Sequence, residues 1–173
     1  MKNALKTAIS LILVLCFVFS FAGCYEDYTE TESSDYIEFD VDKFEQELRH
    51  NVKYEAKFPE ESLKSSVLGI HFPTLPKKES GEPIVKGDFW VGEDVATADL
   101  ILLMKTDDEK DTDTIVKWAQ DHKASLIETY SDYDAEEVKK IENAVIRKNG
   151  KFVVFVITDD YKTAQGIVDK HWS

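Results

Sequence analysis

The alternation of hydrophobic and polar positions is most regular in the C-terminal half of the chain. Residues 98–105, ADLILLMK, form a continuous apolar run of strand length, which is typical of a strand covered on both faces. In the next segment apolar residues recur on one helical face, which predicts a helix over residues 112–129. The residues on this face are Ile115, Ala119, His122, Leu126 and Tyr130.

A second, shorter helix is predicted after a break near Asp132. Asp134 and Glu137 form a capping-box-like pair, the pattern in which a side chain at the start of a helix bonds to its free backbone N–H groups. The apolar Val138 and Ile141 follow at helical spacing. We therefore expect this helix to begin at about Asp134.

A β-hairpin is predicted next. Asn149 and Gly150 suit the positive φ angles that a type I′ turn requires, and β-branched residues flank them on both sides. The two strands are predicted at residues 143–148 and 151–158. Six consecutive apolar residues, 152–157, indicate that the second strand is central and buried on both faces.

The chain ends in a predicted helix over residues 160–172, with Asp159 or Asp160 as its N-cap. Its apolar stripe consists of Ala164, Ile167, Val168 and His171. The C-terminal order is therefore β-α-α-β-β-α. This order predicts an α+β fold, with a small, mainly antiparallel sheet and helices packed on it.

The part before this region has a weaker pattern. Val41, Phe44 and Leu48 predict a short helix over residues 42–51, capped by Asp40 or Asp42. Prolines and glycines interrupt residues 58–82 repeatedly. Within that stretch Pro59 favours the start of a short helix, and residues 67–72 favour a brief strand.

The N-terminus has the layout of an export signal: Lys2 and Lys6, an apolar stretch, and then small residues. The 16 largely apolar residues from Ala8 to Gly23 are fewer than the ~20 that a membrane-spanning helix needs. The tetrapeptide that ends at Cys24, FAGC, resembles the lipobox of bacterial lipoproteins, in which the cysteine receives a diacylglyceryl group. Its phenylalanine departs from the usual leucine.

Two alternatives to lipid attachment are open. An ordinary signal peptidase would release a chain that starts at Gly23, or the signal would stay uncleaved. Lipid attachment is favoured because Cys16 lies inside the apolar segment, so a processed chain keeps Cys24 as its only cysteine and cannot form an internal disulfide. We therefore predict a lipoprotein signal peptide at residues 1–23, and a fatty-acylated protein on the extracytoplasmic face of the cell membrane.

Removal of residues 1–23 would leave 150 residues, and because Lys2 and Lys6 are lost the formal charge would change from −13 to −15. Residues 24–35 combine the lipidated cysteine with an acidic tract that cannot fold alone, and we expect them to form a disordered spacer. Residues 36–173 are long enough for one α+β domain. The charge argues against nucleic acid, anionic lipid or wall polymer as a direct electrostatic partner. Cationic ligands stay open as partners, although the favoured interpretation is that the negative charge keeps the domain soluble.

Three stretches carry a resemblance to a known family: ADLILLMK, the pair Tyr130 and Tyr133 before DAEEVKKIENAVI, and NGKFVVFVITDD. Residues 98–172, about half of the predicted mature chain, resemble an uncharacterised family of lipoproteins from Gram-positive bacteria, a domain of unknown function. The resemblance implies a membrane-tethered extracytoplasmic α+β domain. It supplies no catalytic residues.

The chain has no recognised catalytic, cofactor or metal motif. Glycine-rich phosphate loops, dinucleotide fingerprints and G-x-S-x-G are absent from the sequence. The four histidines, His50, His71, His122 and His171, lack metal-ligand spacing. We therefore predict no cofactor, no metal and no catalytic residue, although a pair of carboxyl groups in a glycosidase leaves no sequence signature.

The stretch GDFWVGED contains a weak candidate for a binding surface. In a strand, Phe89 and Trp90 point to opposite faces, so we expect one to pack inward and the other to be exposed. Packing is favoured over ligand stacking for Trp90. The anchor, spacer and compact domain predict a tethered binding or interaction module with an envelope protein as partner. The alternative is a cell-envelope glycan hydrolase that uses Asp and Glu carboxyl groups.

Overall fold

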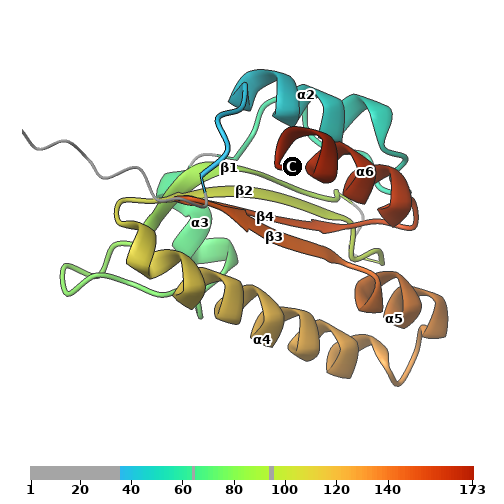
Figure 1. Cartoon of the computed structure of the whole chain (residues 1–173). Helices are drawn as coiled ribbons and strands as arrows, with labels where there is room; N and C mark the ends of the chain where they lie inside the picture. The colour runs from blue at the N-terminus through green and yellow to red at the C-terminus, as the bar shows by residue number, and fades with distance from the viewer. Residues whose placement is uncertain (1–35, 64, 94–95) are drawn as a thin grey trace, which may run out of the picture. The chain divides into compact units, whose positions relative to one another are not determined.

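The computed structural model describes residues 36–63, 65–93 and 96–173. Within these residues four strands form one antiparallel sheet in the order β1-β2-β4-β3, with helices on both of its faces (Figure 1). The predicted α+β fold and its C-terminal order β-α-α-β-β-α are confirmed. The strands are β1 (Val85–Val91), β2 (Leu100–Thr106), β3 (Val145–Asn149) and β4 (Phe152–Ile157).

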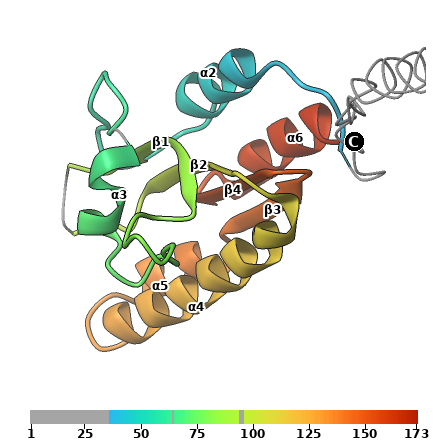
Figure 2. The same ribbon diagram turned by 90° about the vertical axis from the view of Figure 1, so that its left-hand side faces the viewer.

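The helices form a layer on each side of the sheet (Figure 2). One layer contains α2 (Val41–Asn51) and α6 (Tyr161–His171). The other contains α3 (Ser65–His71), α4 (Thr112–Tyr130) and α5 (Ala135–Glu142), and a short 3-10 helix, η2 (Glu109–Asp111), leads into α4. Each layer buries its own hydrophobic cluster against the sheet.

Strands β2 and β4 pair at the centre of the sheet, as predicted. Leu102 lies opposite Phe155 and packs beneath α4, whereas Ile101 lies opposite Val156 and packs beneath α2 and α6. Successive side chains of both strands therefore enter different cores, which explains why the two runs are apolar without interruption. Each buried side chain of this kind stabilises the fold by about 1.5–3 kcal/mol.

The hairpin between β3 and β4 differs from the predicted one by one residue. Asn149 still belongs to β3 and pairs with Phe152, so the loop consists of Gly150 and Lys151. Gly150 has a φ of +51°, and no other type of residue in the described chain has a positive φ. The predicted type I′ turn is therefore wrong, and the signs of φ fit a type II′ turn, which has glycine at its first central position.

The side chain of Asn149 fixes the start of the described chain. Its Oδ1 accepts a hydrogen bond of 2.6 Å from the backbone N–H of Ile37, and its Nδ2 donates one of 2.6 Å to the Ile37 carbonyl. The ring of Tyr36 lies beside Gly150, where a Cβ atom would approach it within 2.7 Å. The chain therefore enters the domain at the hairpin turn.

Two predictions for the irregular segment before β1 are wrong. Residues 67–72 lie mostly in helix α3 instead of a strand, because Leu68 and Phe72 are four residues apart and are buried together against the sheet. No helix begins at Pro59, because residues 60–63 are not helical. The segment instead approaches β1 through a single bridge from Leu63 to Phe89.

Helix α2 agrees with its prediction, and Asp40 Oδ1 caps it by accepting a hydrogen bond of 3.0 Å from Lys43 N. In the described part of the chain, no helix has both the length and the apolar character needed to cross a membrane. The predicted signal peptide, the lipid site at Cys24 and the spacer all lie outside the described residues and stay predictions.

Candidate functional site

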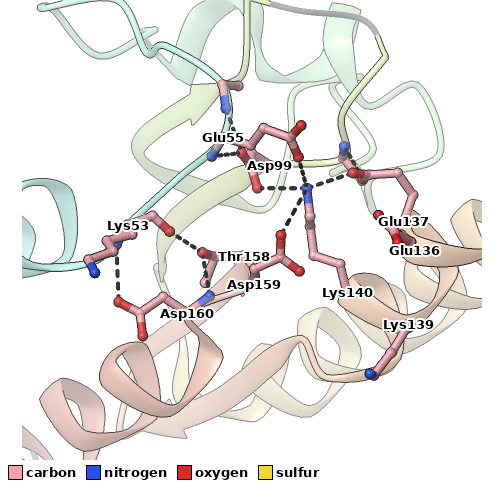
Figure 3. Close-up of polar contacts among 12 residues, drawn as sticks. Lys53, Glu55, Asp99, Glu136, Glu137, Lys139, Lys140, Thr158, Asp159 and Asp160 are labelled. Atoms are coloured by element: carbon pink, nitrogen blue, oxygen red, sulfur yellow. Dashed lines mark hydrogen bonds and ion pairs between the residues drawn. The ribbon is translucent and has the colours of Figure 1, made fainter.

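One end of the sheet, where β2 begins and β4 ends, brings together a lysine and four acidic side chains (Figure 3). They come from α5, from the residue before β2, from the loop after α2 and from the loop after β4. We refer to this group as the Lys140 cluster. Its members are Lys140, Glu137, Asp99, Glu55 and Asp159.

The ammonium group of Lys140 lies at the centre of the cluster. Its Nζ is 2.6 Å from Glu137 Oε1, 3.1 Å from Glu55 Oε2, 3.5 Å from Asp99 Oδ1 and 3.9 Å from Asp159 Oδ2. The side chains of Lys140, Asp99 and Glu137 are buried, whereas those of Glu55 and Asp159 are 62% and 74% exposed. The cluster thus has a buried interior and an acidic outer rim.

Backbone N–H groups donate hydrogen bonds to both buried carboxylates and so satisfy much of their acceptor capacity. Glu137 Oε2 accepts a hydrogen bond of 2.8 Å from Ala98 N. Asp99 Oδ2 accepts two of 2.7 Å, from Glu55 N and Ala56 N. Asp99 Oδ1 has no hydrogen bond among the described residues and faces the Lys140 ammonium. A buried carboxylate is stable when it is paired and hydrogen-bonded in this way.

The carboxylates keep Lys140 protonated. Burial alone would lower the pKa of Lys140, but hydrogen bonds to Glu137 and Glu55 and the charge of Asp99 outweigh burial, so the pKa is raised. A protonated lysine can act neither as a nucleophile nor as a base. The interior of the cluster is therefore suited to holding chain segments together. The exposed carboxyl groups of Glu55 and Asp159 leave an excess of negative charge at its rim.

A second set of hydrogen bonds joins the same loops (Figure 3). Thr158 Oγ1 donates to the Lys53 carbonyl at 2.5 Å, and Lys53 N donates to Asp160 Oδ2 at 3.2 Å. Asp160 occupies the N-cap position of α6, as predicted, but it makes no capping bond to the helix backbone because its side chain accepts from Lys53 and Thr163. The loop after α2 is thus connected to the loop after β4.

The two predicted binding residues, Phe89 and Trp90, do point to opposite faces, but both are buried, with exposed fractions of 0% and 1%. The expected exposure of one of them is wrong, because β1 is covered on both faces. Phe89 packs against Phe72 near α3, and the guanidinium of Arg49 from α2 lies 4.8 Å from the ring of Trp90.

His122 and His171 lie on opposite faces of the sheet, beside Phe72 and Phe44 respectively. His122 stacks on Trp118 within the aromatic core, and burial lowers its pKa. His171 Nε2 lies 3.1 Å from a carboxylate oxygen of Glu47. Among residues 36–173, outside the gaps at 64 and 94–95, no group of three or more His, Cys, Asp or Glu residues could hold a metal ion.

No motif in the sequence predicts the Lys140 cluster as a whole, although α5 carries a signal for part of it. Asp134 caps this helix through Glu136 N and Glu137 N, as predicted, but the Glu137 carboxylate does not return to the N-cap. Glu137, Lys140 and Ile141 share one helical face, and all three are buried. A charged pair beside an apolar residue on the buried stripe of a helix indicates a buried ion pair.

Comparison with known proteins identifies one part of the chain. The family model described as "Domain of unknown function (DUF4358)" matches residues 90–158. Residues 90–158 therefore resemble this domain, and they make up less than half of the chain. The matched segment contains Asp99, Glu137 and Lys140, whereas Glu55 and Asp159 lie outside it. Searches of curated proteins and of solved structures gave no match. The expected resemblance to a domain of unknown function is supported, and its lipoprotein character stays a prediction.

Proposed function

We propose that this protein is a lipid-anchored binding domain on the extracytoplasmic face of the cell membrane, with an envelope protein as its partner. The N-terminal sequence supports this proposal, because an apolar segment with the layout of an export signal ends at Cys24 and an acidic tract follows. The diacylglyceryl group on Cys24 holds the domain at the membrane. We expect the predicted spacer, if it behaves as a flexible coil, to give the domain a reach of roughly 15–20 Å.

The observation that carries the proposal is the place where the chain enters the domain. Asn149 holds Ile37, and Tyr36 lies beside Gly150, so the attachment point is the hairpin turn. The Lys140 cluster lies at the opposite end of β2 and β4. Strands of this length separate the two ends by roughly 20 Å. A tether at the hairpin turn therefore leaves the acidic rim of the Lys140 cluster accessible to a partner.

A cell-envelope glycan hydrolase is the alternative. A glycosidase places one protonated and one ionised carboxyl group on opposite sides of a sugar. In the Lys140 cluster the buried carboxylates of Asp99 and Glu137 instead accept hydrogen bonds from the backbone and face the ammonium group. This use of the buried carboxylates favours binding over hydrolysis.

Fatty-acid labelling tests the anchor. Cells grown with a clickable fatty acid should label the wild-type chain and not Cys24→Ser, and the substituted chain should leave the membrane fraction or accumulate as precursor. Label that still enters the Cys24→Ser chain would contradict the anchor at this residue.

A product assay tests binding against hydrolysis. The purified protein should release no fragments from envelope glycans and should crosslink to an envelope protein when it is anchored. Release of fragments that is lost on replacement of one specific Asp or Glu, with the fold intact, would establish the hydrolase instead.

A further inference from the structure

A hollow of about 300 Å³ opens at the end of the sheet where β1 begins and β2 ends, opposite the Lys140 cluster. Three of its five lining residues are lysines, in a chain whose formal charge is −13. The lining residues are Lys86, Lys105, Thr106, Asp107 and Lys151. The hollow is therefore a local exception to the acidity of the protein.

Strand register brings the lysines together. Lys86 lies directly opposite Lys105 in the β1–β2 pair, and Lys105 lies opposite Phe152, the residue after Lys151. Like charges directly opposite each other on neighbouring strands are destabilising. An anion between them would remove this repulsion.

Carboxylates offset only part of this positive charge: Asp107 belongs to the lining, and the charge of Lys151 acts on Asp108. Asp107 lies 2.5 Å from the ammonium of Lys78 and 3.4 Å from that of Lys86, and these two lysines lower its pKa. Lys105 has no carboxylate partner among the described residues, and its ammonium lies 5.2 Å from the ring of Phe152. Lys105 thus holds a positive charge in the hollow that no carboxylate in this part of the chain offsets.

We propose that this hollow binds an oxyanion of the phosphate class, with Lys105 as the main cationic group and Lys151 and Lys86 beside it. Lysine ammonium groups are compact point charges with three donors each, so they suit a tetrahedral oxyanion and need no planar fork geometry. The overall acidity of the sequence argues against anionic partners, but it does not describe this end of the sheet, because the lysines meet only after folding.

The source of the phosphate is a free anion or a phospholipid headgroup. The chain enters the domain beside the same hairpin turn that carries Lys151. If the protein is anchored as proposed above, the hollow lies at the tethered end, within reach of lipid phosphates. The headgroup source rests on the proposed function, whereas the binding of phosphate itself does not.

Two titrations of the chain from residue 24, which contains every described residue, test the proposal. The first uses inorganic phosphate at low ionic strength, followed by calorimetry. The second uses the Cys24→Ser form with vesicles of phosphatidylglycerol and, for comparison, of phosphatidylcholine. The test variant is Lys105→Gln with Lys151→Gln, and the matched control is Lys139→Gln, an exposed lysine on α5 that points away from the Lys140 cluster (Figure 3).

We expect saturable binding by the wild type and the control, and binding at least about tenfold weaker in the double variant, with an unchanged melting temperature. Binding of phosphate alone supports a soluble anion, and binding of anionic vesicles alone supports the headgroup. The proposal is overturned if neither probe binds, or if Lys139→Gln weakens binding as much as the double variant. Absence of lipid on Cys24 would remove the anchor and leave the phosphate titration unaffected.

Discussion

Replacing Lys140 by Met is predicted to destabilise the domain strongly. Methionine keeps the unbranched apolar stem and removes the ammonium, so the substitution measures the contribution of the charge to stability. The exposed fractions of the side chains of Lys140 and Asp99 are 2% and 0%, and that of Glu137 is 6%. Removing one partner of a buried ion pair leaves an uncompensated charge and costs about 3–5 kcal/mol. For a domain of this size that corresponds to a fall in melting temperature of roughly 6–20 °C.

Urea denaturation followed by circular dichroism measures this loss. Lys139→Met, at the exposed neighbouring position, is the matched control and should change the unfolding free energy by about 0.5 kcal/mol or less. Lys140→Met combined with Glu137→Gln should lose less unfolding free energy than the sum of the two single losses. The reason is that the second substitution removes one of the uncompensated charges. A loss below about 1 kcal/mol for Lys140→Met, or strict additivity, would refute the account of the cluster.

Two further predictions concern the turn and the aromatic core. Gly150→Val should lower the melting temperature, because a β-branched residue is strained at a φ of +51° and its Cβ would meet the ring of Tyr36; an unchanged melting temperature would contradict the turn. Burial lowers the pKa of His122, so the unfolded chain binds its proton more readily and stability should fall as pH drops below about 6.5. His122→Gln should reduce this loss between pH 7 and pH 5 in urea titrations, and an unaltered pH dependence would show that other groups cause it.

The sheet centre and the long helices were predictable from the sequence because their signals are local. Residues 100–104 and 153–157 enter two cores at once, so their apolar runs are unbroken. The predicted turn lies one residue too early, because Asn149 still pairs with Phe152 in the sheet and its side chain is hydrogen-bonded to Ile37, 112 positions away. Likewise, a short apolar run such as residues 67–72 does not distinguish a strand from a buried helix.

The candidate sites were less predictable because their members are distant in sequence. Lys140 and Glu55 are 85 positions apart and meet only when the loop after α2 closes over the end of the sheet. Lys105 and Lys151 likewise approach through the pairing of β2 with β4. Only the pair Glu137 and Lys140 leaves a local trace, on one face of α5.

The central claim, a binding domain anchored through Cys24, is tested most directly by mass spectrometry of the N-terminal peptide of the protein purified from membranes. The account predicts a peptide that begins at Cys24 and has the added mass of a diacylglyceryl group. A peptide that begins at another residue, with an unmodified thiol on Cys24, would contradict it.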